Sequence, residues 1–158
     1  MTTAPTPRSS RRLVHSIEEL LHLELDAIEA YEAALDRLDD AASREQLSRF
    51  VEDHRRHARE LARRVRALGG EPPRGPDLRR LLTQGKVVLA RLGGDRAVLM
   101  AMRSNENETN NRYERALELS GLDEPTRALL EDHLADERRH RAWIVQRIET
   151  LPPGIHIG

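Results

Sequence analysis

The chain has no cysteine, few aromatic residues and almost no net charge, and each of these absences excludes a class of function. Without cysteine there is no disulfide framework, no thiolate nucleophile and no sulfur-ligated zinc or iron site. Any metal must therefore be held by oxygen and nitrogen. The 27 acidic and 26 basic residues nearly cancel, so there is no overall field to attract nucleic acid or an anionic membrane. We expect neither nucleic acid nor membrane as a partner.

Long hydrophobic runs are also missing from the chain. No stretch approaches the roughly 20 apolar residues that a membrane-spanning helix needs. Arg11 and Arg12 resemble the arginine pair of a twin-arginine export signal. The segment that follows them is acidic, whereas such a signal continues with apolar residues. The sequence therefore predicts a cytoplasmic protein.

The composition that remains is typical of a helical domain. The chain is 158 residues long, 38% hydrophobic and 34% charged, and it is rich in the strong helix formers Ala, Leu, Glu and Arg. This length suits one all-α domain, which we place at 15–150. Residues 1–14, with two prolines and no helical period, are expected to form a flexible tail, and residues 151–158 a C-terminal tail.

Four amphipathic stripes predict four helices. They run from 16 to 38, from 43 to 69, from 95 to 121 and from 123 to 152. Capping boxes at Ser16 and Ser43 are expected to open the first two helices, and Asp95 and Asp123 to cap the last two.

The lengths of the connections predict how the helices are joined. The first and third connections span only a few residues, which forces two antiparallel hairpins. The link over 69–94 contains a Gly and Pro loop and then a short helix at 78–92, enough chain to run the length of a bundle. We therefore expect a four-helix bundle of two antiparallel hairpins joined by a long crossover that contains a short helix.

Each stripe carries a carboxylate or an imidazole where an apolar residue is expected. These side chains are Glu24, His54, His57, Glu106, Glu137 and His140. An ionised carboxylate in a helix core costs several kcal/mol unless it is paired or bound to a metal. In a hairpin, two residues lie at one height when they are equally far from the turn, and the midpoints of 24 with 57 and of 106 with 137 both fall in expected turns. The sequence therefore predicts one shared site at mid-bundle.

The two hairpins also look like degenerate copies of each other. Glu24 lies seven residues before Tyr31, and Glu106 lies seven residues before Tyr113. The segment Asp-His-Arg-Arg-His at 53–57 matches Asp-Glu-Arg-Arg-His at 136–140, except that a histidine stands where the second copy has glutamate. The spacing of about 82 residues between copies is typical of the pseudo-twofold halves of a bundle.

This pattern resembles the ligand pattern of ferritin-like di-iron carboxylate proteins, and over about residues 15–148 the chain is similar to bacterial ferritin-like bundle proteins of unassigned function. The family takes one Glu from each of two helices and Glu-x-x-His from each of the other two. The resemblance implies terminal ligands Glu24 and Glu106, nitrogen ligands His57 and His140, a bridging Glu137, and Asp53 and Asp136 as outer partners of the histidines.

His54 departs from the family pattern, because it stands at the position of the second bridging glutamate. A neutral imidazole brings no negative charge and does not bridge as a carboxylate does. Three glutamates then face a pair of dications that usually has four. We predict an asymmetric or mononuclear site.

Oxygen and imidazole ligands suit iron, manganese or zinc, and the resemblance implies iron, as one or two ions. It also implies reaction with dioxygen or peroxide, as a ferroxidase-like or small-substrate oxidase, although whether the chain is an enzyme stays open. The alternatives are a metal-free buried network in a structural, stress-related or protein-interaction bundle, and mineral storage in a cage. A homo-oligomer, dimeric or larger, also stays open.

Three further polar side chains are expected near the site. Tyr31 and Tyr113 lie on the ligand faces of their helices, where core packing is the favoured role and a hydrogen bond to the site is the alternative. His133, one turn before Glu137, is expected to extend the polar patch, and the alternative is a role as a further ligand.

Overall fold

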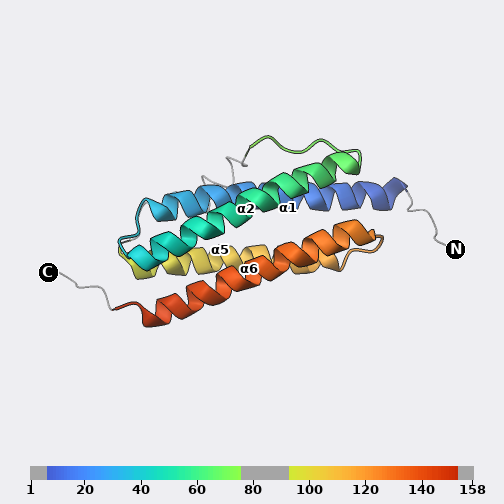
Figure 1. Cartoon of the computed structure of the whole chain (residues 1–158). Coiled ribbons are helices and arrows are strands. Elements are labelled where there is room, and N and C mark those ends of the chain that lie inside the picture. Colours follow the sequence, from blue (N-terminus) through green and yellow to red (C-terminus); the bar gives the residue numbers. More distant parts are fainter. Residues whose placement is uncertain (1–6, 76–92, 153–158) are drawn as a thin grey trace.

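The computed structural model describes residues 7–75 and 93–152, which form a bundle of four long α-helices (Figure 1). The helices are α1 (Pro7–Leu35), α2 (Ala41–Ala67), α5 (Asp95–Leu117) and α6 (Glu124–Thr150). This confirms the predicted all-α fold. Within the described ranges, no helix is long and apolar enough to cross a membrane.

The first helix begins earlier than the sequence predicted. It starts at Pro7, where the fixed φ of proline suits the first helical turn, and not at the capping box of Ser16. Residues 7–14, expected to belong to a flexible tail, are helical in the structure. Leu13 is only 7% exposed and packs in the core, so tertiary contacts support this additional length of helix.

Two of the predicted helix caps are also wrong. Asp40, not Ser43, caps α2, and its carboxylate accepts hydrogen bonds from the Ser43 backbone N–H at 3.0 Å and from the Ser43 hydroxyl at 2.6 Å. Helix α5 has Gly94 as its N-cap. The carboxylate of Asp95 instead accepts the backbone N–H groups of Asp39 and Asp40, each at 2.8 Å. The predicted Asp123 cap of α6 is confirmed, with the Thr126 N–H donating at 3.3 Å.

Contacts at the two ends of the bundle fix the helix directions. At one end, Asp95 at the start of α5 holds the turn between α1 and α2, and Arg147 near the end of α6 donates two hydrogen bonds to Asp40. At the other end, Arg64 of α2 pairs with Asp123 before α6. The two predicted antiparallel hairpins are therefore present, and α2 ends at the opposite end from the start of α5 (Figure 1). The predicted short helix at 78–92 lies outside the described residues.

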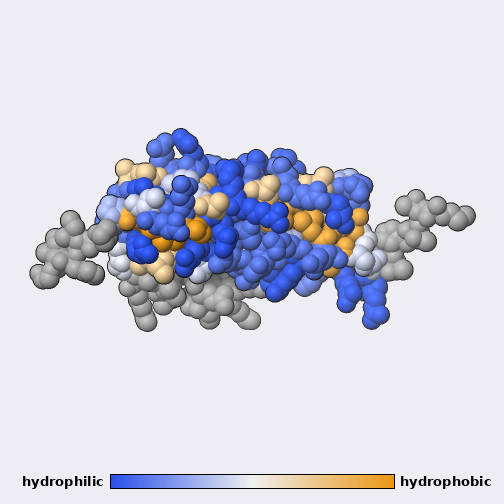
Figure 2. Space-filling view, turned by 90° about the horizontal axis from the view of Figure 1, so that it is seen from below, coloured by the Kyte–Doolittle hydropathy of each residue, from blue (hydrophilic) through white to orange (hydrophobic). Residues whose placement is uncertain are grey.

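The interior consists of two apolar clusters with a polar layer between them. The cluster at the α1–α2 turn contains Tyr31, Leu47, Phe50, Leu99, Met102 and Ile144 among others. The cluster at the opposite end contains Ile17, Leu20, Leu61, Val65, Tyr113 and Leu130 among others. Each fully buried Leu, Ile or Phe side chain contributes about 1.5–3 kcal/mol, which offsets the cost of a polar layer. The face in Figure 2 is likewise hydrophilic in the middle, with apolar patches towards both ends.

Candidate metal centre

The polar layer is made by the six side chains that the sequence singled out. All six are 0% exposed, and every helix supplies at least one of them. The pairs His54 with His57 and Glu137 with His140 are each three residues apart, which places both members on one face of their helix. The structure therefore brings the predicted residues to one level, as the hairpin midpoints indicated.

The six side chains form two overlapping groups with the spacing of metal ligands. Within each group, one ligand atom per residue lies within 4.8 Å of all the others. We call Glu24 and His57 the Glu24 half-site, and Glu106 and His140 the Glu106 half-site. His54 and Glu137 belong to both groups, which is an arrangement suited to one or two ions.

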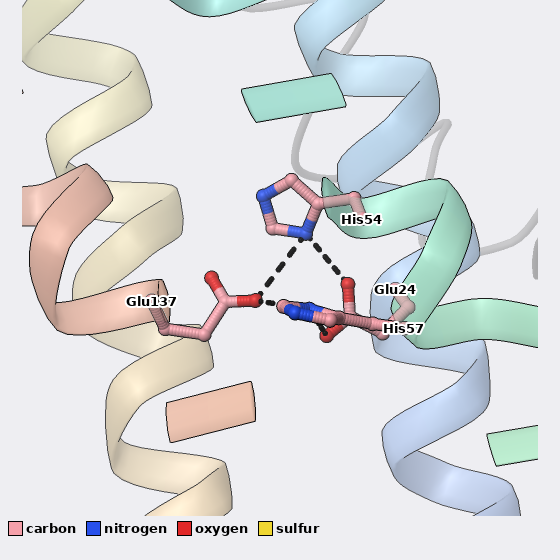
Figure 3. Close-up of side chains that lie close together, drawn as sticks. All are labelled: Glu24, His54, His57 and Glu137. Carbon is pink, nitrogen blue, oxygen red and sulfur yellow. Dashed lines mark hydrogen bonds and ion pairs between the residues drawn. The ribbon is translucent and has the colours of Figure 1, made fainter. Parts of the chain in front are cut away.

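The Glu24 half-site is tightly hydrogen-bonded (Figure 3). His54 Nδ1 lies 2.6 Å from Glu24 Oε2, and His57 Nδ1 lies 3.2 Å from Glu24 Oε1 and 3.0 Å from Glu137 Oε1. The Tyr113 hydroxyl also donates to Glu24 Oε1, at 2.5 Å. Both oxygens of Glu24 are therefore engaged.

The Glu106 half-site is more loosely connected. The Tyr31 hydroxyl donates to Glu106 Oε1, and His54 Nε2 lies 3.4 Å from the same oxygen. His140 Nδ1 is 3.6 Å from Glu106 Oε1 and 3.5 Å from Glu137 Oε2, beyond hydrogen-bond geometry. Glu106 Oε2, Glu137 Oε2 and His140 Nδ1 have no hydrogen-bond partner among the described residues. A buried polar atom without a partner is costly, and all three atoms are of the kinds that bind a transition metal, so these residues fit a metal ion.

Two aspartates hold the outer nitrogens of the histidines. Asp136 Oδ2 lies 2.9 Å from His57 Nε2, and Asp53 Oδ2 lies 2.8 Å from His140 Nε2. Arg139 donates to both aspartates, at 3.0 Å to Asp53 and 2.9 Å to Asp136. A carboxylate behind a histidine fixes the ring and directs its other nitrogen inward, as outer partners of metal ligands do. Asp53 and Asp136 therefore have the geometry expected for them.

The charges of the cluster are strongly coupled. Burial lowers the pKa of His54, but the charge of Glu24 and the hydrogen bonds with Glu106 and Glu24 outweigh it and raise this pKa to about 10. Burial raises the pKa of Glu106, yet the neighbouring His140 and His54 lower it to about 2. Burial and the charges of Glu24 and Glu106 raise the pKa of Glu137 well above its ordinary value. Without a metal, the charge of His54 compensates part of the negative charge of Glu24 and Glu106.

Both tyrosines combine the two roles that the sequence left open. Tyr31 and Tyr113 are fully buried in the apolar clusters, and their hydroxyls donate to Glu106 and Glu24 respectively. Burial, together with the charge of the accepting glutamate, raises the pKa of each tyrosine well above 10. Each tyrosine therefore stays a neutral hydrogen-bond donor.

Three more residues complete the surroundings of the site. His133 extends the polar patch as expected: its Nδ1 lies 3.1 Å from the Tyr113 hydroxyl, and its ring stacks on His57 at a centroid distance of 4.0 Å. Its Nε2 lies 2.9 Å from Glu60. The sequence analysis missed Glu60 and Asn110, whose side-chain amide donates to the backbone carbonyls of Glu106 and Glu137. The available signal for Asn110 was its position four residues after Glu106, on the same helix face.

Solved structures share this arrangement of helices. A ferritin-like diiron-carboxylate protein from Bacillus anthracis is 23% identical, with a TM-score of 0.74 over 90% of this chain and 99% of that one. Desulfovibrio desulfuricans bacterioferritin, described with a diiron site, is also 23% identical, with a TM-score of 0.76 over 94% of this chain and 86% of its own. The dodecameric thioferritin of Bacteroides fragilis is 22% identical, with a TM-score of 0.73 and coverages of 89% and 86%. At these identities the likeness shows the fold, which is that of the ferritin-like diiron-carboxylate proteins.

Comparison of the sequence with known families and proteins gave one match to a family. No curated protein is significantly similar to the chain in sequence. Residues 12–119, more than half of the chain, match the family described as Domain of unknown function (DUF2383).

Proposed function

The chain belongs to the DUF2383 family, and we propose that it is a ferritin-like metalloprotein whose buried Glu and His cluster binds iron, as one or two ions. One observation carries the proposal: ligand-type side chains from four helices, all 0% exposed, bring carboxylate oxygens and imidazole nitrogens together in two overlapping groups with the spacing of metal ligands. Burying so many such groups is costly unless a cation compensates for it.

The ligands are drawn from Glu24, His54, His57, Glu106, Glu137 and His140. Asp53 and Asp136 hold the histidine rings, and the two apolar clusters exclude water from either side of the site. Oxygen and imidazole ligands also suit manganese and zinc, and iron is preferred because proteins of the same fold are described as diiron proteins. Bound iron would supply redox chemistry with dioxygen or peroxide, which makes a ferroxidase-like or small-substrate oxidase activity part of the proposal.

A second candidate function is a metal-free bundle with a structural, stress-related or protein-interaction role. The observation that favours it is His54, whose imidazole lies 2.6 Å from Glu24 and 3.4 Å from Glu106. A protonated His54 is an internal cation, and it compensates part of the negative charge that a metal otherwise balances.

Metal loading separates the two candidates. The protein is purified without added metal, loaded anaerobically with Fe²⁺, dialysed and analysed for metal per chain. The Glu137→Gln variant, which is nearly isosteric, is expected to lose the metal, whereas the control Glu131→Gln, on the exposed side of α6, is expected to keep it. If the wild type retains no metal, the metal-free candidate stands.

We also infer a cytoplasmic location and self-association. The fold is shared with an assembly described as dodecameric, and a dimer or larger homo-oligomer is the proposed state. Light scattering on the purified chain measures the assembly size, and a molar mass of a single 18.0 kDa chain would contradict self-association.

A further inference from the structure

We propose, building on the metal-binding function proposed above, that one ion binds per chain, in the Glu106 half-site, and that Glu24 is an outer partner of His54 instead of a ligand. The ligands are then Glu106, Glu137, His140 and the Nε2 atom of His54. These four residues are one of the two groups with metal-ligand spacing.

The Glu24 half-site is already satisfied by hydrogen bonds within the protein. Glu24 Oε2 pairs with His54 Nδ1 at 2.6 Å, and Glu24 Oε1 accepts from the Tyr113 hydroxyl at 2.5 Å. His57 lies between carboxylates on both sides, with Nδ1 3.0 Å from Glu137 and Nε2 2.9 Å from Asp136. An ion in this half-site would have to break several of these contacts.

The unpartnered ligand atoms of the cluster, in contrast, belong to the Glu106 half-site and to Glu137, which both groups share. Glu106 Oε2, Glu137 Oε2 and His140 Nδ1 are buried atoms without a hydrogen-bond partner in the described part of the chain. They come from side chains that are 0% exposed. The two oxygens of Glu137 also divide between the half-sites, with Oε1 next to His57 and Oε2 next to His140.

The contact between Glu24 and His54 repeats the contacts behind the other two histidines. Asp136 holds His57 Nε2 and Asp53 holds His140 Nε2, and Glu24 holds His54 Nδ1 in the same way. A carboxylate that accepts a hydrogen bond from one imidazole nitrogen orients the ring and leaves the other nitrogen for a metal. For His54 this other nitrogen is Nε2, which faces Glu106.

Charge favours a single ion as well. Two dications carry four positive charges, whereas Glu24, Glu106 and Glu137 together carry at most three negative ones. A single dication between Glu106 and Glu137 is neutralised by these two carboxylates, and the remaining charge of Glu24 is stabilised by its hydrogen bonds with His54 and Tyr113. Buried sites tolerate uncompensated charge poorly, so replacing the second bridging glutamate with His54 favours one ion.

A matched pair of variants tests the location. His57 and His140 each direct Nδ1 inward and Nε2 to an aspartate, so His57→Gln and His140→Gln are equivalent losses in the two half-sites. Equilibrium dialysis against Co²⁺ with metal analysis gives stoichiometry and Kd, and the visible spectrum of Co²⁺ reports its coordination. We expect one ion per chain in the wild type, little change in His57→Gln, and a loss of at least tenfold in affinity in His140→Gln.

A third variant tests the role of His54 without removing a ligand position. His54→Glu restores the second bridging carboxylate and is expected to raise the stoichiometry from one to two ions per chain. Two ions in the wild type, or loss of the ion in His57→Gln with retention in His140→Gln, would overturn the inference and leave metal binding intact. A wild type that binds no ion would overturn metal binding itself. Circular dichroism of each variant checks that the helices are retained.

Discussion

His54 determines how the two halves of the centre differ. Its partner by internal symmetry is Glu137, and at that position a carboxylate offers one oxygen to each half-site. The imidazole of His54 instead places one nitrogen at 2.6 Å from Glu24 and the other at 3.4 Å from Glu106. Histidine in place of glutamate at position 54 therefore changes both the charge of the polar layer and its symmetry.

The tyrosine hydroxyls offer a test at the residue scale. Tyr113→Phe removes the donor at 2.5 Å from Glu24 and leaves His133 Nδ1 without its contact to the hydroxyl. Because the groups are buried, we expect a loss of about 1–3 kcal/mol in the free energy of unfolding, measured by urea denaturation. The metal stoichiometry should not change if Glu24 lies outside the coordination sphere.

Tyr31→Phe is the matched control for this prediction. Tyr31 donates to Glu106, which is a proposed ligand in the Glu106 half-site. We expect this variant to change the Kd for Co²⁺ while Tyr113→Phe does not. Equal changes in both variants would contradict the difference between the half-sites.

At the scale of the helices, the start of α2 depends on a residue from another helix. Asp40 caps α2, and its carboxylate also accepts two hydrogen bonds from Arg147 of α6, at 3.0 and 2.7 Å. The hydrogen bonds from Arg147 and Ser43 lower the pKa of Asp40 from 3.8 to about 2. The cap therefore couples the end of one hairpin to the other.

Asp40→Asn tests this coupling through its dependence on pH. We expect a loss of about 1–2 kcal/mol at pH 7, because asparagine keeps the cap but loses the charge that strengthens the two hydrogen bonds from Arg147. A lowered folded-state pKa gives stability that is present above the ordinary pKa and is lost as the pH falls through the folded-state value. The difference from the wild type should therefore shrink between pH 4 and about pH 2. Urea denaturation at several pH values measures it, with Asp132→Asn on the exposed side of α6 as control.

The sequence predicted the level of the site better than the ends of the helices. The heights of Glu24, His57, Glu106 and Glu137 follow from counting residues from two short turns, because the rise per residue of a helix is constant. The helix ends depend on tertiary contacts. Asp40 and Ser43 are both good caps by residue type, and the contact with Arg147, more than 100 residues away, favours Asp40.

The individual side-chain contacts within the polar layer could not be predicted from sequence patterns. Counting residues places His54 at the level of Glu24 and Glu106. It does not say which nitrogen of His54 faces which carboxylate. The stacking of His133 on His57 and its contact with Glu60 depend on helix rotation and on side-chain rotamers. A change of a few degrees in helix rotation, or of one side-chain rotamer, changes these contacts. A pattern of residue types does not determine either quantity.

For the whole molecule, the polar layer links metal binding to stability. The layer separates two apolar clusters and joins all four helices, so an ion that binds only the folded state stabilises the entire bundle. At a free metal concentration of 1,000 times Kd, the gain is about 4 kcal/mol, which for a chain of this size raises Tm by on the order of 10 °C.

Calorimetry with and without a chelator measures this effect. We expect the loaded wild type to unfold at a higher temperature than the chelated protein, and His140→Gln to show a smaller difference in Tm between the two conditions. If the Tm of the wild type is the same with metal and with chelator, metal binding does not stabilise the bundle, which would contradict this prediction.

The most direct test of the account is an anomalous diffraction measurement on crystals of the wild-type protein loaded with iron or cobalt. The account predicts a strong anomalous peak in the polar layer at mid-bundle, next to His54, Glu106, Glu137 and His140. A map in which Glu24, His54, Glu106 and Glu137 keep their places with no anomalous peak among them would contradict it.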